Sequence, residues 1–209
     1  MDEMAAREAI CRFGQSLFDR GLAHGSAGNI SLRLDDGGLL ATPTNVSLGS
    51  LDPAALSRFD VGGRHIDGAP PTKEMPLHRA LYESRASAGA IVHLHSTHSV
   101  AVSMLPGIDS ADVLPPLTAY YLMRVGRTAL IPFHRPGDER VGAAIRGLAG
   151  RYSAVLLANH GPVVAGTTLE KAVWATEELE ETAKLYLLLR GLRPNWVPAD
   201  EIDALRDEA

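Results

Sequence analysis

The sequence has almost no cysteine, no dense basic segment and no long apolar run. Cys11 is the only cysteine in 209 residues, which excludes a disulfide within the chain and makes a reducing cytoplasm the expected compartment. The formal net charge is −5, so the chain lacks the basic footprint of a protein that binds nucleic acid or an anionic membrane. No apolar run approaches the length needed to span a bilayer. A small anionic substrate stays possible, because it needs only a local pocket.

Length and composition favour one folded domain. A chain of 209 residues with 45% hydrophobic content can bury a full core. We therefore predict a single domain over residues 1–209, in which residues 191–209 form a C-terminal tail.

Two histidines follow a stretch with strand preferences. Residues 90–92 are Ala-Ile-Val, and His93 and His95 come directly after them, one residue apart. Side chains at positions i and i+2 of a strand leave the same face, which is the geometry of two ligands on one metal. Ser96 can then cap a helix, so the histidines are predicted to lie where a strand ends. The alternative is that they are only the polar end of a strand.

A third histidine occurs in a similar setting. The apolar run 154–157 reads as a buried strand and leads into Asn159-His160-Gly161, where the chain is predicted to turn. Three imidazoles are the ligand set of a catalytic zinc site that keeps one coordination position open. The three histidines together favour metal binding.

Three segments rich in hydrogen-bond donors are candidates for anion binding. A loop of small residues presents Ser26 and Asn29, and residues 42–45, Thr-Pro-Thr-Asn, follow a second predicted strand. Thr72 and Lys73 lie at or just before the N-terminus of a predicted helix, where backbone N–H groups and the helix dipole favour a phosphate. Glu74 would lie beside this site, unless it only stabilises the start of the helix.

Several other polar groups are predicted to have ordinary structural positions. His78 is expected on the helix surface, and the glutamates of 177–181 on a solvated helix face. The segment 61–71 is expected to be turn. Either Tyr120 or Tyr121 can offer a phenol to an active site, although both are also common packing residues.

Five motifs carry a family resemblance through their order and spacing. They are Gly25-Ser26-Ala27-Gly28-Asn29, Thr42-Pro43-Thr44, Lys73-Glu74, His93-Leu94-His95 and Asn159-His160-Gly161. This set resembles the class II aldolase/adducin family over about residues 5 to 190. Within the family, it looks most similar to the branch of bacterial 3-oxo-tetronate 4-phosphate decarboxylases.

The resemblance implies a fold, an assembly and a metal. The fold would be a three-layer α/β/α arrangement around a mainly antiparallel sheet, and the assembly a fourfold-symmetric homotetramer with active sites at subunit interfaces. A divalent metal, usually zinc with manganese or cobalt as alternatives, would be held by His93, His95 and His160. Glu74 would ligate it when substrate is absent and act as acid and base during turnover.

The resemblance also implies a phosphate pocket and a proton donor. The pocket residues would be Ser26, Asn29, Thr44, Asn45, Thr72 and Lys73. Tyr120 matches the tyrosine that donates a proton across the subunit interface. Three positions depart from the family pattern: Asn45 replaces a usual glycine, Thr72 a common serine, and Ala119 a proline often found in the decarboxylase branch.

The activity implied is that of a carbon-carbon lyase acting on a phosphorylated sugar acid. It would convert 3-oxo-tetronate 4-phosphate to dihydroxyacetone phosphate and carbon dioxide through a metal-stabilised enediolate. Retro-aldol cleavage uses the same enediolate, so a sugar-phosphate aldolase of the fuculose-phosphate type or a 4-epimerase is the first alternative. A non-catalytic, adducin-like interaction module is the second, and a complete set of metal ligands argues against it.

Overall fold

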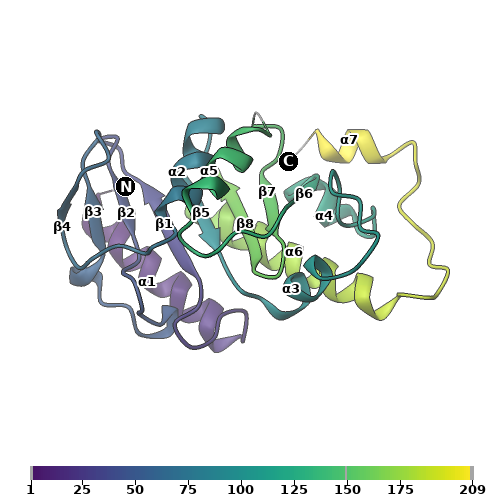
Figure 1. Cartoon of the computed structure of the whole chain (residues 1–209), viewed down its shortest axis with the longest axis horizontal. Coiled ribbons are helices and arrows are strands. Elements are labelled where there is room, and N and C mark those ends of the chain that lie inside the picture. Colours follow the sequence, from purple (N-terminus) through teal and green to yellow (C-terminus); the bar gives the residue numbers. More distant parts are fainter. Residues whose placement is uncertain (1, 149, 208–209) are drawn as a thin grey trace.

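A computed structural model describes residues 2–148 and 150–207 (Figure 1). Its centre is an eight-stranded sheet with the order β4-β3-β2-β1-β5-β8-β7-β6. The strands are β1 (Asn29–Arg33), β2 (Leu39–Ala41), β3 (Ser57–Phe59), β4 (His65–Asp67), β5 (Ala90–His93), β6 (Thr128–Ile131), β7 (Ala154–Leu157) and β8 (Gly161–Gly166). Only the pair β6 and β7 is parallel, so the predicted mainly antiparallel sheet is confirmed.

Helices cover both faces of this sheet. They are α1 (Glu3–Asp19), α2 (Met75–Ser84), α3 (Thr97–Ser103), α4 (Ala119–Arg124), α5 (Glu139–Arg146), α6 (Leu169–Leu188) and α7 (Ile202–Arg206), with short 3₁₀ turns at η1 (Leu48–Ser50) and η2 (Pro53–Ala55). Neighbouring residues of β5 separate the layers: Ile91 packs with α2 and α5, whereas Val92 packs with α1 and α6. The predicted three-layer α/β/α fold is therefore confirmed.

The register of the central strands brings distant polar residues together. On β5, His93 pairs with Asn29 of β1 on one side and with Val163 of β8 on the other. Gly161, the first residue of β8, lies very close to the backbone of Leu94. A Cβ atom at position 161 would lie 2.1 Å from the carbonyl oxygen of Leu94. The turn before β8 is thus held against the end of β5.

The C-terminal tail packs against the same chain. The backbone N–H of Val197 donates to the carbonyl oxygen of Pro116 at 3.0 Å, and Arg206 forms an ion pair with Asp112 at 2.6 Å. The side chains of Ile202 and Leu205 in α7 pack against the group of buried apolar side chains that includes those of α4. The described part of the tail therefore has a docking place on its own chain.

Two local expectations were wrong. The segment 61–71, predicted as turn, contains the short edge strand β4, which pairs with β3. Glu180, predicted on a solvated face with the other glutamates of α6, is buried. Its carboxylate accepts hydrogen bonds from the backbone N–H groups of His98 and Ser99, both at 2.8 Å. A carboxylate can stabilise the exposed N–H groups of a helix start, and α3 obtains its cap from this distant helix.

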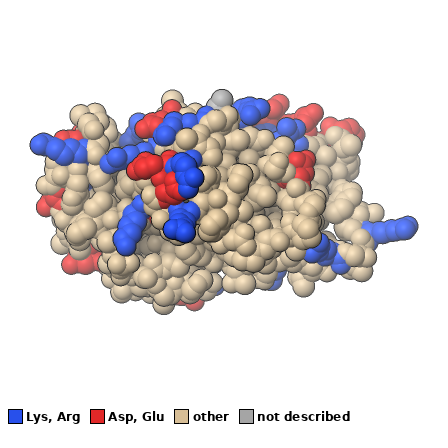
Figure 2. Space-filling model, in the orientation of Figure 1, with Lys and Arg blue, Asp and Glu red and all other residues tan. Residues whose placement is uncertain are grey.

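The surface shows no dominance of one charge on the face in Figure 2. Basic and acidic side chains are interspersed, and much of this face carries neither. In the described part of the chain, no helix is long and apolar enough to cross a bilayer.

Candidate metal centre

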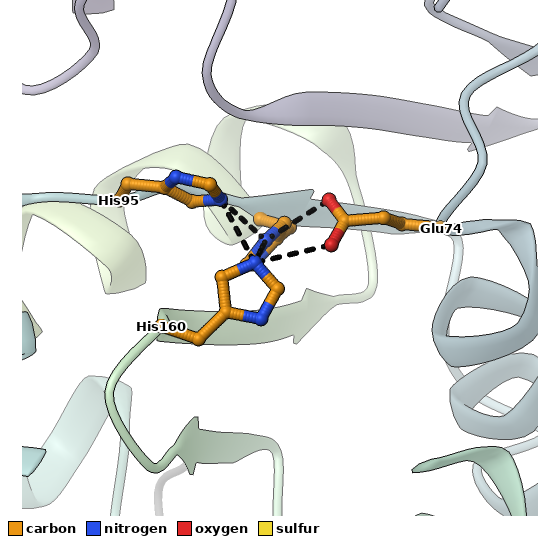
Figure 3. Close-up of side chains that lie close together, drawn as sticks. Glu74, His95 and His160 are labelled. Carbon is orange, nitrogen blue, oxygen red and sulfur yellow. Dashed lines mark hydrogen bonds and ion pairs between the residues drawn. The ribbon is translucent and has the colours of Figure 1, made fainter. Parts of the chain in front are cut away.

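Four side chains from three parts of the sequence meet at one edge of the sheet. His93 ends β5, His95 follows two residues later, His160 lies in the turn between β7 and β8, and Glu74 occupies the N-cap position of α2. Figure 3 shows the imidazoles of His95 and His160 and the carboxylate of Glu74 pointing toward one another. One ligand atom from each of the four residues lies within 4.8 Å of all the others.

The spacing of the imidazole nitrogens fits a shared cation. The Nε2 atom of His160 lies 3.0 Å from that of His95, and His93 Nε2 lies 3.1 Å from His95 Nε2 and 3.3 Å from His160 Nε2. Nitrogen ligands of a tetrahedral zinc ion lie about 3.3 Å apart, given Zn–N distances of about 2.0 Å. Hydrogen bonds cannot join all three Nε2 atoms to one another. Each ring nitrogen either donates or accepts, so at least two of the three must be of the same kind.

The hydrogen bonds around the cluster also fit a cation. The Nδ1–H group of His93 donates to the carbonyl oxygen of Pro162 at 2.8 Å, which leaves the lone pair of Nε2 free for a ligand bond. The Oε1 atom of Glu74 is buried and accepts no hydrogen bond from the described residues, although it lies 3.1 Å from His160 Nε2. A buried carboxylate oxygen without a donor is costly unless another positive group faces it, so the donor set suits a divalent metal.

The electrostatics of the cluster keep His95 and Glu74 in the form that binds a metal. Burial, together with the neighbouring His93 and His160, lowers the pKa of His95 to about 3, so this imidazole is neutral at physiological pH. Burial by itself would raise the pKa of the Glu74 carboxyl. Attraction to His93 and His160 outweighs burial and holds the pKa of Glu74 below its ordinary value. Neutral imidazoles and an ionised carboxylate are the required ligand forms.

A second layer of buried polar groups supports Glu74. The amide Nδ2 of Asn29 donates to Glu74 Oε2 at 2.8 Å, and His78 contacts the Oδ1 atom of the same amide. The expectation that His78 lies on the helix surface was wrong, because its side chain is fully buried. The face of α2 that carries His78 packs on β1, where Ser31 provides a second polar partner for the ring.

The donor-rich segments differ in how far their side chains are exposed. Asn29 and Thr72 are buried, and the Oγ1 atom of Thr72 accepts from the backbone N–H of Glu74 at 3.2 Å. Thr44 is half-buried, and its backbone N–H donates to the carbonyl oxygen of Pro70. Ser26 and Lys73 are exposed, so they are accessible to a ligand.

Asn45 takes up the conformation for which glycine is best suited. Its φ angle is +58°, in the left-handed region that disfavours most side chains and that asparagine tolerates better than other non-glycine residues. Asparagine at position 45 is therefore compatible with the left-handed backbone conformation of this loop.

The two adjacent tyrosines have opposite environments. Tyr121 is fully buried, and its hydroxyl contacts Thr128 Oγ1 at 3.0 Å, so it is a packing residue of the core. The side chain of Tyr120 is 58% exposed, and the guanidinium of Arg124 lies over its ring. Tyr120 is not one of the four described residues that form the cluster.

One segment beside the cluster was not predicted from the sequence. A narrow pocket is lined by Glu74 and His160 together with His134 and Arg135, which belong to the loop after β6. The parallel pairing of β6 with β7 explains this position, because residues that follow parallel strands emerge at the same edge of a sheet. The signal available in the sequence was the His-Arg pair that follows an apolar strand after two intervening residues, Pro132 and Phe133.

Comparison with known proteins gives matches over nearly the whole chain. Residues 8–187 match the family described as Class II Aldolase and Adducin N-terminal domain. The chain is 49% identical to a 3-oxo-tetronate 4-phosphate decarboxylase from Pectobacterium atrosepticum, over 97% of this chain and 93% of that protein. It is 32% identical to L-fuculose phosphate aldolase of Escherichia coli, over 90% of this chain and 82% of that protein.

A solved structure has nearly the same fold. The crystal structure of YgbL from Escherichia coli superposes with a TM-score of 0.95 at 48% sequence identity, and the match covers 98% of this chain and 99% of that chain. The arrangement of strands and helices described above is therefore that of an experimentally determined relative.

Proposed function

This chain belongs to the class II aldolase and adducin family, and we propose that it is a 3-oxo-tetronate 4-phosphate decarboxylase. It would be a carboxy-lyase that forms carbon dioxide and dihydroxyacetone phosphate. The observation that carries this proposal is similarity over nearly the full length to a decarboxylase of that name, combined with the convergence of Glu74 and three histidines. The identity to an aldolase is markedly lower.

We propose that His93, His95 and His160 hold a divalent metal, with zinc preferred over manganese or cobalt, and that Glu74 is a further ligand before substrate binds. Once bound, the cation supplies Lewis-acid stabilisation of negative charge on the substrate's carbonyl oxygen. Three neutral imidazoles leave that positive charge undiminished, which is why the donor set suits this role.

Glu74 is the proposed acid and base. The substrate carbon that loses its carboxylate must gain a proton, and Glu74 lies at the cluster with two unequal oxygens. Oε2 is held by the amide of Asn29, whereas Oε1 accepts no hydrogen bond. We therefore assign the transferred proton to Oε1.

We propose that the phosphate binds to the donor-rich segments that come before Glu74 in the sequence. Backbone N–H groups of the loop 25–28, the hydroxyls of Ser26, Thr44 and Thr72, the amides of Asn29 and Asn45, and the ammonium of Lys73 would bind the phosphate. Anchoring the phosphate away from the breaking bond would orient the carboxylate for departure. The second N–H of the Asn29 amide is available for this contact, because only one is used by Glu74.

A homotetramer in the cytoplasm completes the proposal. Tyr120, the proposed proton donor, is exposed and is not part of the cluster of its own chain, so it would serve the active site of a neighbouring subunit. The proposal of a cytoplasmic location rests on the near absence of cysteine. Each subunit is proposed to be one domain.

The decisive experiment measures carbon dioxide released from 3-oxo-tetronate 4-phosphate. Zinc-loaded protein, chelated protein and protein reloaded with zinc are compared, with Glu74→Gln as a matched variant that keeps size and removes the exchangeable carboxyl proton. Release that is lost on chelation, restored by zinc and absent in Glu74→Gln supports the proposal. No release from protein shown to contain zinc contradicts it.

Aldol cleavage is the second candidate, because the chain also resembles L-fuculose phosphate aldolase. An aldolase or 4-epimerase would act on sugar phosphates without a carboxylate. The same zinc-loaded protein is therefore incubated with ketose and pentulose phosphates, and cleavage or epimerisation faster than carbon dioxide release would favour this candidate. A non-catalytic interaction module has no use for a cluster of four potential metal ligands.

A further inference from the structure

We propose that His78 is a positioning residue that sets the orientation of the Asn29 amide and, through it, the Glu74 carboxylate. This inference rests on the acid and base role proposed for Glu74. It assigns a task to a buried histidine that lies outside the metal cluster.

The observation behind it is a continuous chain of buried hydrogen bonds. The hydroxyl of Tyr82 lies 3.0 Å from Ser31 Oγ, which lies 2.7 Å from His78 Nδ1. The other ring nitrogen, Nε2, contacts Asn29 Oδ1, and the amide Nδ2 of Asn29 lies 2.8 Å from Glu74 Oε2. His78 and Ser31 are both fully buried, so water does not compete for these contacts.

The carboxylate at one end determines the direction of every bond in this chain. An ionised carboxylate only accepts, so the Asn29 amide must turn its NH₂ group toward Glu74 and its Oδ1 atom toward His78. Oδ1 also only accepts, so Nε2 of His78 carries the ring proton. Nδ1 then accepts from Ser31, and Ser31 accepts from Tyr82. Each group donates toward Glu74, and no donor or acceptor between Tyr82 and Glu74 conflicts with another.

The consequence for Glu74 is that its two oxygens become unequal. An asparagine amide can rotate by 180° with little change in shape, and the opposite orientation would place Oδ1 against the carboxylate. In the tautomer that the carboxylate selects, His78 disfavours this rotation, because its Nε2–H group would then face the NH₂ group of Asn29. Oε2 is thereby fixed to Asn29, and Oε1 is left for the proton that the reaction moves.

Two substitutions, each of which keeps a different one of the two His78 hydrogen bonds, test this role. In His78→Gln the side-chain amide reaches the position of Nε2 and can still donate to Asn29. In His78→Asn the amide reaches only the position of Nδ1, so it can bond to Ser31 but not to Asn29. We expect His78→Asn to lower kcat about 10- to 100-fold with little change in KM, and His78→Gln to recover most of kcat.

A purely structural role would affect both variants alike. Equal kcat values in folded His78→Asn and His78→Gln would therefore overturn the inference. Exchange of a hydroxymethyl hydrogen of dihydroxyacetone phosphate in D₂O reports proton transfer alone, and it is expected to fall in parallel with kcat.

Two further measurements do not depend on turnover. Nitrogen NMR of the wild-type protein should show the His78 ring protonated at Nε2, and protonation at Nδ1 would overturn the inference even if His78→Asn fails to fold. A crystal structure of zinc-loaded His78→Asn should show the Glu74 carboxylate displaced, with its position kept in His78→Gln. If the wild type releases no carbon dioxide, the proposed function fails, while these two results still decide the position of His78 in the network.

Discussion

Replacing Glu180 by alanine should destabilise the protein strongly, although this glutamate lies in a cluster of charged helix residues. Its carboxylate accepts from the backbone N–H groups of His98 and Ser99, from Ser99 Oγ at 2.7 Å and from the His98 ring at 2.8 Å. These donors lie in the first turn of α3, which begins two residues after His95. Glu180 therefore joins α6 to the segment that carries a predicted metal ligand.

The expected magnitude follows from the number of donors that lose an acceptor. A hydrogen bond to a charged group contributes about 1.5–3 kcal/mol, and the contributions are not additive because the donors share one carboxylate. We expect a loss of about 3–5 kcal/mol in the free energy of unfolding. For a chain of this length, this loss corresponds to a decrease in Tm of roughly 6–20 °C.

The effect should depend on pH. Burial by itself would raise the pKa of Glu180, but the hydrogen bonds from Ser99 and His98 outweigh burial and hold the pKa below its ordinary value. A carboxyl with a lowered pKa in the folded state stabilises the protein above its unfolded pKa of about 4.3, and the stabilisation is lost as the pH falls through the folded pKa. The difference between wild type and Glu180→Ala should therefore be constant near pH 7 and shrink below about pH 4.

The assay is urea unfolding followed by circular dichroism, with Glu181→Ala as the control. Glu181 is one residue away on the same helix, but it is exposed and forms only a surface ion pair with Lys184 at 3.4 Å. Its loss should change the free energy of unfolding by less than about 0.5 kcal/mol. If Glu180→Ala is no less stable than Glu181→Ala, the reasoning about the α3 cap is refuted.

Three further outcomes are expected. His95→Ala should remain folded, because the side chain is only partly buried, but should lose stoichiometric zinc by elemental analysis and all turnover; full activity would rule out the metal mechanism. Arg135→Ala should raise KM for the phosphorylated 3-oxo acid about tenfold, because the substrate loses one charge-assisted contact with the protein. Arg140→Ala should not raise KM, because Arg140 is already paired with Asp138 at 2.6 Å. In urea unfolding, Asn45→Val should cost about 1–2 kcal/mol at a φ of +58°, and Asn45→Gly less than about 1 kcal/mol; equal costs would show that the loop conformation is not left-handed in solution.

The sequence by itself determined the local structure around the centre. Alternation along β5 predicted that His93 and His95 share a face, and Pro76 predicted the start of α2 beside Glu74. These predictions depend only on residues that are close together in the sequence, so they can be made without knowledge of the tertiary packing. The order of five short motifs was also sufficient to identify the family, which the comparisons confirm.

Only the tertiary structure decided which polar side chains are buried and which partners they have. His78 and Glu180 have the sequence surroundings of surface helix residues, yet both are buried, against β1 and α3 respectively. Their partners lie 47 and 81 residues away, and which face of a helix is covered depends on elements that far along the chain. Likewise, Arg135 reaches the pocket beside Glu74 only because β6 pairs in parallel with β7. Residue spacing predicts which groups share a face, but packing decides what that face meets.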